Sequence, residues 1–290
     1  MALDIRGKTA LVTGGASGIC FEVTRQLLAG SCNVLVADLK PSQQLDDLIQ
    51  AARDDGSRAS FIRTDVTKWN ELQAAFDQAV KDFGQLDIVV PGAGIFEPEG
   101  FSNFWCLEQG TDTTEASSFK TLEVNVAHPI RATQLAIDSF LRRKTGHGVV
   151  VLISSIAAQL SPFFKPVYAA SKNAISGFVR SLGDLEPTLN IRVNGIAPGL
   201  VKTAIWTEDV MAYTTGEDLW VTSERVAGVI LDLITNKDHV GGTILEVGKD
   251  KVRPVTILND PGPSGAGTTV GGVDVARNRT YQLIEQNFGK

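Results

Sequence analysis

The chain has 290 residues, 43% of them hydrophobic and 21% charged, and a formal net charge of -6 at pH 7. This length and composition suffice for the core of one large domain, and the acidic balance argues against binding to a nucleic acid or an anionic membrane surface. The sequence has no apolar run near the ~20 residues that span a membrane and no signal-peptide pattern, and its three cysteines and three histidines lack the spacing of a disulfide framework or a metal site. We therefore expect a cytoplasmic protein with no metal ion and with neither a nucleic-acid nor a membrane partner.

Short apolar segments alternate with amphipathic segments along the chain. The apolar segments, which we expect to form strands, are 9–14, 33–38, 59–65, 86–94, 148–155, 191–199 and 242–248. The amphipathic segments, which we expect to form helices, lie near 18–30, 42–55, 69–83, 118–144, 167–186 and 222–235. This alternation predicts an α/β fold, a doubly wound parallel sheet of about seven strands with helices on both faces. We assign residues 1–258 to this domain and 259–290 to a Gly/Pro-rich C-terminal extension.

A glycine-rich turn, "TGGASGIC", joins the first predicted strand to the first predicted helix. Gly14 and Gly18 allow the backbone to turn sharply and to approach a ligand closely, and the free N–H groups at a helix start attract a pyrophosphate. Any tight strand-to-helix turn also needs glycine, so the turn by itself does not identify a nucleotide site. Its position directly after a buried strand favours one.

Asp38 ends the second predicted strand, about twenty residues after the turn. A carboxylate there accepts hydrogen bonds from both ribose hydroxyls of NAD and repels the 2′-phosphate of NADP. Lys40 leaves NADP binding open, because its ammonium can neutralise that phosphate, and Asp38 is also suited to cap a turn. We expect NAD as the cofactor.

The stretch "PVYAASKNAISGF" reads as a helix that carries Tyr168 and Lys172 four residues apart, and therefore on one face. An ammonium beside a phenol favours the phenolate and lowers the pKa of the tyrosine. A phenol that ionises near neutral pH needs roughly 4 kcal/mol of stabilisation, which is more than one exposed lysine contributes. We therefore expect a second cation, or an unusual environment, close to Tyr168.

Ser155 ends the fifth predicted strand, thirteen residues before Tyr168. Together the "TGxxxG" turn, this serine and the Tyr-x-x-x-Lys pattern closely resemble the short-chain dehydrogenase/reductase family, from about Lys8 to Gly248. The resemblance implies a single-domain Rossmann fold in which Ser155, Tyr168 and Lys172 are catalytic and Asn125, in "LEVNVAHP", is a fourth member that holds a proton-relay water.

The resemblance also implies a role for each catalytic residue. Tyr168 is the general base in alcohol oxidation or the acid in the reverse direction, and Ser155 binds the substrate oxygen. Lys172 lowers the pKa of Tyr168 and binds the nicotinamide ribose, while the oxidised nicotinamide ring supplies the second positive charge.

Further residues are implied to bind the cofactor. Asp65 and Val66 would lie near the adenine, and Val201 and Thr203 would contact the nicotinamide amide. The implied set is Gly14, Ser17, Gly18, Ile19, Asp38, Asp65, Val66, Ala93, Gly94, Tyr168, Lys172, Pro198, Val201 and Thr203. Within the family, "PVYAASK", "APGLVKTAIW" and "GGTILEVGKDK" look most similar to the NAD-dependent 15-hydroxyprostaglandin dehydrogenase-like branch.

Two positions depart from the family pattern. Cys20 stands where the family has a third glycine, and Pro91 and Gly92 replace two asparagines of its "NNAG" motif. These changes predict a reduced cofactor affinity, because Cys20 adds a side chain where helix and strand pack closely and the missing amides help to tie sheet and cofactor together. The Cys20 thiol is either a small buried packing residue or a reactive group at a helix start.

Large apolar side chains cluster in three segments: the long stretch after the fourth strand, the approach to Tyr168, and the loop after "PGLVKT". Each is also suited to the core or to an oligomer contact. As a set they predict a large apolar pocket, and they are Phe96, Phe101, Phe104, Trp105, Phe163, Phe164, Trp206, Met211, Tyr213 and Trp220.

The expected activity is hydride transfer between NAD(H) and a bulky, largely apolar secondary alcohol or ketone, a specialised metabolite or lipid-like molecule. The alternatives are an NADPH-dependent carbonyl or imine reductase, and a cofactor-binding homologue with a non-redox role in binding or cyclisation. A Ser–Lys hydrolase would leave the nucleotide turn unexplained. The family resemblance implies a homodimer or homotetramer that pairs the helices holding Asn125 and Tyr168.

Overall fold

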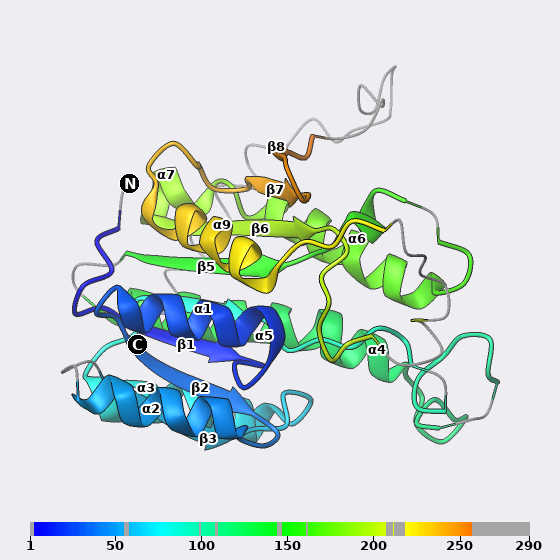
Figure 1. The fold of residues 1–290 in the computed structure, drawn as a ribbon, viewed down its shortest axis with the longest axis horizontal. Helices are drawn as coiled ribbons and strands as arrows, with labels where there is room; N and C mark the ends of the chain where they lie inside the picture. Colours follow the sequence, from blue (N-terminus) through cyan, green and yellow to red (C-terminus); the bar gives the residue numbers. More distant parts are fainter. Residues whose placement is uncertain are drawn as a thin grey trace.

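The computed structural model describes residues 3–54, 58–98, 100–107, 110–143, 147–160, 162–206, 211 and 218–256. Within these ranges the chain forms one sheet with the strand order β3-β2-β1-β4-β5-β6-β7-β8 (Figure 1). The α/β fold with a doubly wound parallel sheet is therefore confirmed. The predicted extension 259–290 lies outside the described residues and stays a prediction.

Seven strands run parallel and coincide with the seven apolar segments of the sequence. They are β1 (Thr9–Thr13), β2 (Asn33–Asp38), β3 (Ala59–Arg63), β4 (Ile88–Pro91), β5 (Gly148–Ile153), β6 (Ile191–Pro198) and β7 (Ile244–Val247). An eighth strand, β8 (Val252–Pro254), pairs antiparallel with β7 at the edge of the sheet. The sequence did not predict β8, because its three residues are partly exposed and have no apolar pattern.

Helices connect the strands and cover the sheet. They are α1 (Gly18–Ala29), α2 (Gln43–Asp54), α3 (Trp69–Phe83), α4 (Lys120–Leu122), the π-helix η1 (Glu123–Ala127), α5 (His128–Leu141), the 3-10 helix η2 (Ile156–Ala158), α6 (Pro166–Ser181), α7 (Leu185–Leu189) and α9 (Ser223–Thr235). Two expected helices are each divided. The segment near 118–144 contains α4, η1 and α5. In the segment near 167–186, α6 ends at Ser181 and α7 begins at Leu185.

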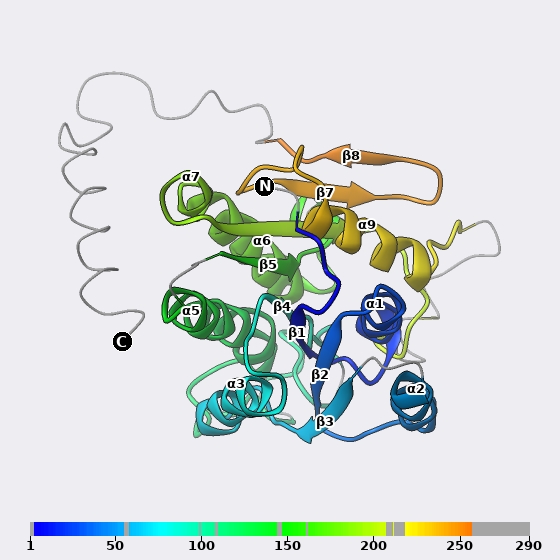
Figure 2. The same ribbon diagram turned by 90° about the vertical axis from the view of Figure 1, so that its left-hand side faces the viewer.

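The helices form one layer on each face of the sheet, as the end-on view of Figure 2 shows. Helices α1, α2 and α9 pack on one face, and α3, α5, α6 and α7 pack on the other. Because successive side chains of a strand point to opposite faces, Val12 of β1 joins the first layer while its neighbour Leu11 joins the second. This burial on both faces explains the continuous apolar runs in the sequence.

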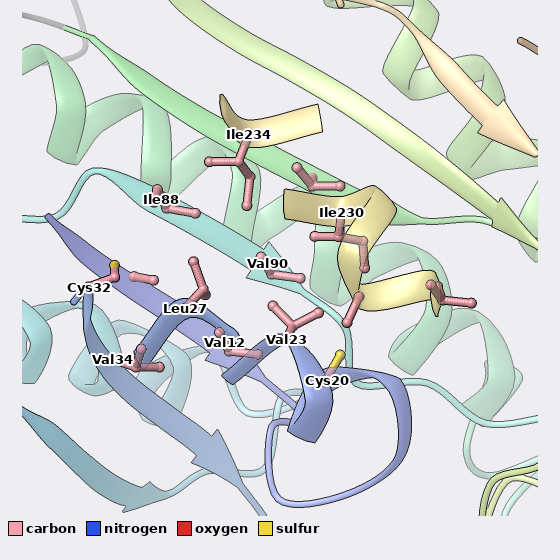
Figure 3. Packing of buried hydrophobic residues seen from close by; sticks show 14 of the residues in the cluster. Val12, Cys20, Val23, Leu27, Cys32, Val34, Ile88, Val90, Ile230 and Ile234 are labelled. Carbon is pink, nitrogen blue, oxygen red and sulfur yellow. The ribbon is translucent and has the colours of Figure 1, made fainter. Parts of the chain in front are cut away.

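The first layer is held by aliphatic side chains from α1, α9 and the central strands (Figure 3). Val23 and Leu27 lie four residues apart on α1 and are completely buried, as are Ile230 and Ile234 on α9. Fully burying one side chain of this size contributes roughly 1.5–3 kcal/mol. The packing of α1 on the sheet fixes where the helix begins, and thus the position of the glycine-rich turn before it.

Candidate active site

The predicted site residues lie at the edge of the sheet where the parallel strands end. β1 pairs with β2 on one side and with β4 on the other, so the strand order reverses at β1. Ligands of doubly wound sheets bind beside such a reversal, outside the carboxyl ends of the strands. The predicted segments after β1, β2, β4, β5 and β6 all leave the sheet at this edge.

The glycine-rich turn is shaped by close backbone contact with the segment after β4. Gly14 has φ +71°, and a Cβ atom added there would lie 2.8 Å from the Cα and N atoms of Ala93. Gly18, the first residue of α1, has φ +57°. Ser17 is the N-cap of α1, but its side chain makes no capping hydrogen bond. The start of α1 therefore offers uncapped N–H groups and a positive dipole, the arrangement that binds a phosphate.

Asp38 connects the end of β2 to this turn. Its Oδ2 accepts a hydrogen bond from the N–H of Ala16 at 3.0 Å, and its Oδ1 accepts one from the N–H of Leu39 at 2.7 Å. Ser42 donates to the carbonyl of Ala16 at 2.8 Å. The capping role that the sequence left open is therefore present, and the half-buried carboxylate stands beside the turn. Lys40 is exposed.

Asp65 and Val66 follow the end of β3. The Asp65 carboxylate accepts hydrogen bonds from the N–H of Thr67 at 3.0 Å and from its hydroxyl at 2.7 Å. Val66 is buried. These contacts fix a short turn that borders the site on the β3 side.

Tyr168 and Lys172 lie one turn apart on α6, and both side chains are buried, with 8% and 6% of their surface exposed. Lys172 Nζ is 5.4 Å from the ring centroid of Tyr168 and donates to the carbonyl of Ile153, the last residue of β5, at 2.9 Å. The side chain of Ser155 hydrogen-bonds that of Tyr168. Ser155 Oγ also accepts from the N–H of Ala157 at 3.1 Å, so η2 fixes its orientation.

Burial controls the ionisation of this pair. It raises the pKa of Tyr168 to about 12, although the hydrogen bond with Ser155 acts in the opposite direction. It lowers the pKa of Lys172 to about 8. In the protein by itself the pKa of Tyr168 is therefore raised and not lowered, because desolvation penalises the phenolate and the ammonium alike. The contribution of Lys172 to the ionisation of Tyr168 stays a prediction.

Asn125 lies within the π-helix η1 and braces the segment after β4. Its Oδ1 accepts from the N–H of Ile95 at 2.9 Å, and its Nδ2 donates to the carbonyl of Ile95 at 2.9 Å and to Ser171 Oγ at 3.2 Å. Both polar atoms of the amide are thus engaged by protein groups. The proton-relay role implied by the resemblance stays a prediction.

The segment after β4 also faces the buried pair. A Cβ atom added to Gly94 would lie 3.4 Å from Asn125 Oδ1 and 3.9 Å from Lys172 Nζ. The N–H of Ala93 donates to Thr13 Oγ1 at 3.3 Å. Gly94 therefore leaves room for a ligand in front of Lys172 without a side chain of its own.

The segment after β6 crosses the glycine-rich turn. Pro198 ends β6, Val201 forms an isolated bridge with Val221, and a Cβ atom added to Gly18 would lie 3.3 Å from the side chain of Thr203. This segment therefore lies against the start of α1.

The two departures from the family pattern contact each other. A Cβ atom added to Gly92 would lie 2.0 Å from Cys20 Sγ, so the sulfur occupies the space of a side chain at position 92. Cys20 is buried at the start of α1 (Figure 3), and burial raises the pKa of its thiol to about 12. Cys20 is therefore a packing residue with an inert thiol, and Gly92 provides its space. Whether cofactor affinity is reduced stays a prediction.

Three of the predicted aromatic residues meet beside Tyr168. The ring centroid of Phe96 lies 4.4 Å from that of Tyr168, Trp206 lies 5.6 Å from Phe96, and Trp220 lies 5.2 Å from Trp206. The predicted residue Tyr213 lies outside the described residues.

Phe104, Trp105 and Phe163 form a separate group, with Trp105 4.8 Å from Phe104 and 4.7 Å from Phe163. A hollow of about 720 Å³ lies beside this group and is lined by apolar side chains such as Phe104 and Leu107 together with polar ones such as Asn103 and Asp112. Neither Ser155, Tyr168 nor Lys172 lines it, so it is not the pocket expected around Tyr168.

The sequence did not indicate several buried polar residues that support the site. His128 follows η1, and its Nε2 lies 3.1 Å from Thr13 Oγ1 while its Nδ1 lies 3.1 Å from the carbonyl of Val124. Burial lowers the pKa of His128 to about 4, so the ring is neutral at pH 7. Glu97 is completely buried next to Phe96. Single polar residues in apolar surroundings give no spacing signal, which is why they were missed.

Neither a membrane-spanning helix nor a metal centre is found in the part of the chain that the structure describes. Its helices lack the length and apolar character needed to cross a membrane, and no three or more His, Cys, Asp or Glu side chains gather there to hold a metal ion.

We predict that Cys20 and Gly92 are energetically coupled. Gly92→Ala should destabilise the protein by about 1–3 kcal/mol through overpacking against the sulfur, and most of this cost should disappear in the Cys20→Ala background. Urea denaturation of the single and double variants measures the coupling. Cys32→Ala, which also truncates a buried cysteine, serves as the control and should combine additively with Gly92→Ala. Additive costs in the Cys20 cycle would contradict the contact.

The lowered pKa of Lys172 predicts a pH-dependent stability. The unfolded chain keeps this lysine protonated up to its usual pKa of 10.5, whereas the folded protein loses the proton near pH 8. The unfolding free energy of the wild type relative to Lys172→Met should therefore rise by about 3 kcal/mol between pH 8 and pH 10.5. Urea denaturation across this range measures it, with Lys40→Met as the control for loss of a surface charge. A constant difference would show that Lys172 stays ionised in the folded protein.

Comparisons with known proteins agree with this geometry. The profile of the short chain dehydrogenase family matches residues 8–213. The chain is 29% identical over 223 residues to the short-chain dehydrogenase/reductase prx4 of Penicillium roqueforti, a match that covers 77% of this chain and 63% of that protein. It is 32% identical over 209 residues to the 15-hydroxyprostaglandin dehydrogenase (NAD(+)) of Homo sapiens, which covers 70% of this chain and 71% of the relative.

A solved structure of a short chain dehydrogenase has a similar fold. The short chain dehydrogenase of Burkholderia cenocepacia J2315, in complex with NADP, aligns with a TM-score of 0.72 and 27% identity, covering 85% of this chain and 98% of that chain. The matched family profile spans the glycine-rich turn, Ser155, Tyr168 and Lys172, the residues that the fold gathers at one edge of the sheet. This chain therefore belongs to the short-chain dehydrogenase/reductase family.

Proposed function

We propose that the protein uses NAD(H) to interconvert a bulky, largely apolar secondary alcohol and its ketone, with Tyr168 as the general acid and base. Membership of the family makes it a dehydrogenase or reductase; the cofactor, the substrate class and the residue roles are our proposal. The observation that carries it is the burial of Tyr168 and Lys172, one helical turn apart and beside Ser155, at the edge of the sheet that bears the glycine-rich turn.

The glycine-rich turn fits a dinucleotide. Gly14 leaves no room for a side chain against Ala93, and α1 begins with no side-chain cap, so the turn can cradle a pyrophosphate. Gly94 leaves space in front of Lys172 for a ribose. When bound, the nicotinamide dinucleotide supplies or accepts the hydride and, in its oxidised form, adds a positive charge to the site.

The chain's own residues handle the proton. In reduction, Tyr168 donates its phenol proton to the carbonyl oxygen, and in oxidation it takes the proton of the alcohol. Ser155 hydrogen-bonds the same oxygen and stabilises the charge that develops on it. Because burial raises the pKa of Tyr168 to about 12, the neutral phenol is the resting form, ready to act as an acid. The charge of Lys172 favours the phenolate that oxidation requires.

Asp38 supports NAD over NADP. Its carboxylate is half-buried at the end of β2 beside Ala16, where it would accept hydrogen bonds from ribose hydroxyls and repel a 2′-phosphate. The relatives divide on this point, since the human protein is named for NAD(+) and the Burkholderia structure holds NADP. In the alternative, an NADPH-dependent reductase, Lys40 would neutralise the 2′-phosphate of the cofactor.

We propose oxidation of the alcohol as the main direction of the reaction, because the cytosolic NAD pool is kept mostly oxidised.

The aromatic side chains near Tyr168 support a bulky, weakly polar substrate. Phe96, Trp206 and Trp220 form a chain of ring contacts that begins at the Tyr168 ring. Aromatic walls of this kind favour apolar ligands, with a few polar groups setting their orientation. A specialised metabolite or a lipid-like alcohol fits this description.

We further propose that the protein is a cytoplasmic homodimer or homotetramer in which α5 and α6 of neighbouring copies pair.

Cofactor preference is predicted to depend on Asp38. A fluorescence titration should give at least tenfold tighter binding of NADH than of NADPH, and Asp38→Ser should reduce this ratio to near one, because the carboxylate no longer repels the 2′-phosphate. Asp46→Asn removes an exposed carboxylate of α2 and should leave the ratio unchanged. Tighter binding of NADPH than of NADH by the wild type would contradict the proposal that the cofactor is NAD.

Turnover is predicted to depend on the Tyr168 hydroxyl. In a screen of bulky secondary alcohols with NAD⁺, Tyr168→Phe should lower kcat at least 100-fold, the usual contribution of a positioned acid or base. The dissociation constant of NADH should change less than threefold, which shows that the variant is folded. Turnover that survives the change would point instead to the non-redox role.

A further inference from the structure

The helix that carries Tyr168 and Lys172 does not cap its own beginning. Lys165 occupies the N-cap position of α6, and its side chain makes no capping hydrogen bond. The first N–H groups of a helix have no partner within the helix, and the N–H of the third helical residue is one that an N-cap side chain usually engages. In α6 the third residue is Tyr168.

Glu97, 71 residues away in sequence, supplies this missing cap. Its Oε2 accepts a hydrogen bond from the N–H of Tyr168 at 2.7 Å. Its Oε1 accepts one from the N–H of Phe104 at 3.0 Å. The side chain is completely buried, and a carboxylate is favoured at the positive end of a helix. One buried carboxylate thus joins the backbone of Tyr168 to the segment after β4.

The backbone of Glu97 is itself held in place. It has φ +46°, a left-handed conformation that is uncommon for residues other than glycine. Its carbonyl accepts hydrogen bonds from Lys165 Nζ at 2.9 Å and from Asn103 Nδ2 at 3.1 Å, and both donors belong to buried side chains. A strained residue persists where its surroundings over-determine it, and such residues concentrate at functional sites.

The contact continues into the site through Phe96. The ring of Phe96, the residue before Glu97, stands edge-on to the Tyr168 ring at 4.4 Å. Glu97 therefore fixes the backbone of Tyr168, while its neighbour in sequence packs on the side chain of Tyr168. The side chain of Ser155 is oriented separately, by the hydrogen bond that it accepts from the N–H of Ala157. The Tyr168–Ser155 geometry thus depends on the link through Glu97.

We propose that Glu97 is a positioning residue, which caps α6 from the segment after β4 and holds the Tyr168 hydroxyl in register with Ser155. This inference rests on the proposed function of Tyr168. It predicts that the loss of one acceptor oxygen from Glu97 affects the chemical step more than cofactor binding, because the Glu97 carboxylate bonds Tyr168 and Phe104 whereas Asp38 bonds the glycine-rich turn.

Asp112 offers a matched control in the same part of the chain. Its Oδ1 accepts from the N–H of Lys120, the first residue of α4, at 2.8 Å, and its Oδ2 accepts from Ser102 Oγ at 2.8 Å. Like Glu97 it ties the segment between β4 and α5 to a helix start, but it does not touch Tyr168. Asp112→Asn therefore reports the cost of loosening this segment without displacing the phenol.

The kinetic test compares Glu97→Gln with Asp112→Asn, using NAD⁺ and an alcohol whose turnover requires Tyr168. Glutamine keeps the shape of the side chain but can accept only one of the two hydrogen bonds. Glu97→Gln should lower kcat ten- to 100-fold and displace the pH profile of kcat, with KM and the NADH dissociation constant within threefold of the wild type. Asp112→Asn should keep the wild-type kcat and pH profile even if its Tm falls. A Glu97→Gln enzyme with wild-type kcat and pH profile would overturn the proposal, whatever its Tm.

A second measurement needs no substrate. The chain has three tyrosines, and mass spectrometry after mild nitration with tetranitromethane reports the reactivity of Tyr168 by itself. Tyr168 should be protected in the wild type and in Asp112→Asn, and at least fivefold more reactive in Glu97→Gln, since water reaches a displaced phenol. Equal protection in all three would overturn the positioning role.

These measurements separate the two hypotheses. If Tyr168→Phe retains turnover, the proposed function fails while the nitration test still decides the role of Glu97. If Glu97→Gln does not fold, Glu97→Asp replaces it, because the shorter carboxylate keeps the charge and cannot reach both N–H groups. The same kinetic and nitration outcomes then apply.

Discussion

The backbone contact between the ends of β1 and β4 is the constraint on which the site depends. Thr13 pairs with Pro91 in the parallel register of these strands, so the glycine-rich turn and the segment that contains Ala93 leave the sheet side by side. Gly14 then packs so closely on Ala93 that no side chain fits between them. Because the strand order reverses here, the helices that follow β1 and β4 cover opposite faces of the sheet and leave the edge open for a ligand.

Burial and hydrogen bonding have opposite effects on the groups at this edge. Desolvation disfavours the charged forms of Tyr168 and Lys172, which keeps the phenol protonated and makes the ammonium costly. The hydrogen bond from Lys172 to Ile153 holds the ammonium in place despite that cost, and the effect of Ser155 partly offsets the raised pKa of Tyr168. A positive charge brought by a ligand would lower the cost of ionising Tyr168, because it favours the phenolate.

Much of the fold and of the candidate site could be predicted from the sequence. The seven parallel strands follow from apolar runs buried on both faces, and Tyr168 and Lys172 follow from helical spacing. The features that could not be predicted depend on contacts between distant segments. β8 is too short and too exposed to have a pattern, the π-helix around Asn125 has no sequence signature, and the pKa of Tyr168 depends on burial that no local spacing reveals. Cys20 and Gly92 are separate departures from the family pattern in the sequence, but in the structure the sulfur of Cys20 fills the space of a side chain at Gly92.

The central claim is that this edge of the sheet is built to hold a nicotinamide dinucleotide across the reversal at β1, with its nicotinamide half at Tyr168. A crystal structure of the protein grown with NADH tests this claim most directly. We predict density for the adenosine ribose at Asp38, the pyrophosphate at the start of α1, and the nicotinamide ribose within hydrogen-bond distance of Lys172 and Tyr168. A structure at saturating NADH with this edge empty, or with the cofactor bound elsewhere, would contradict the claim.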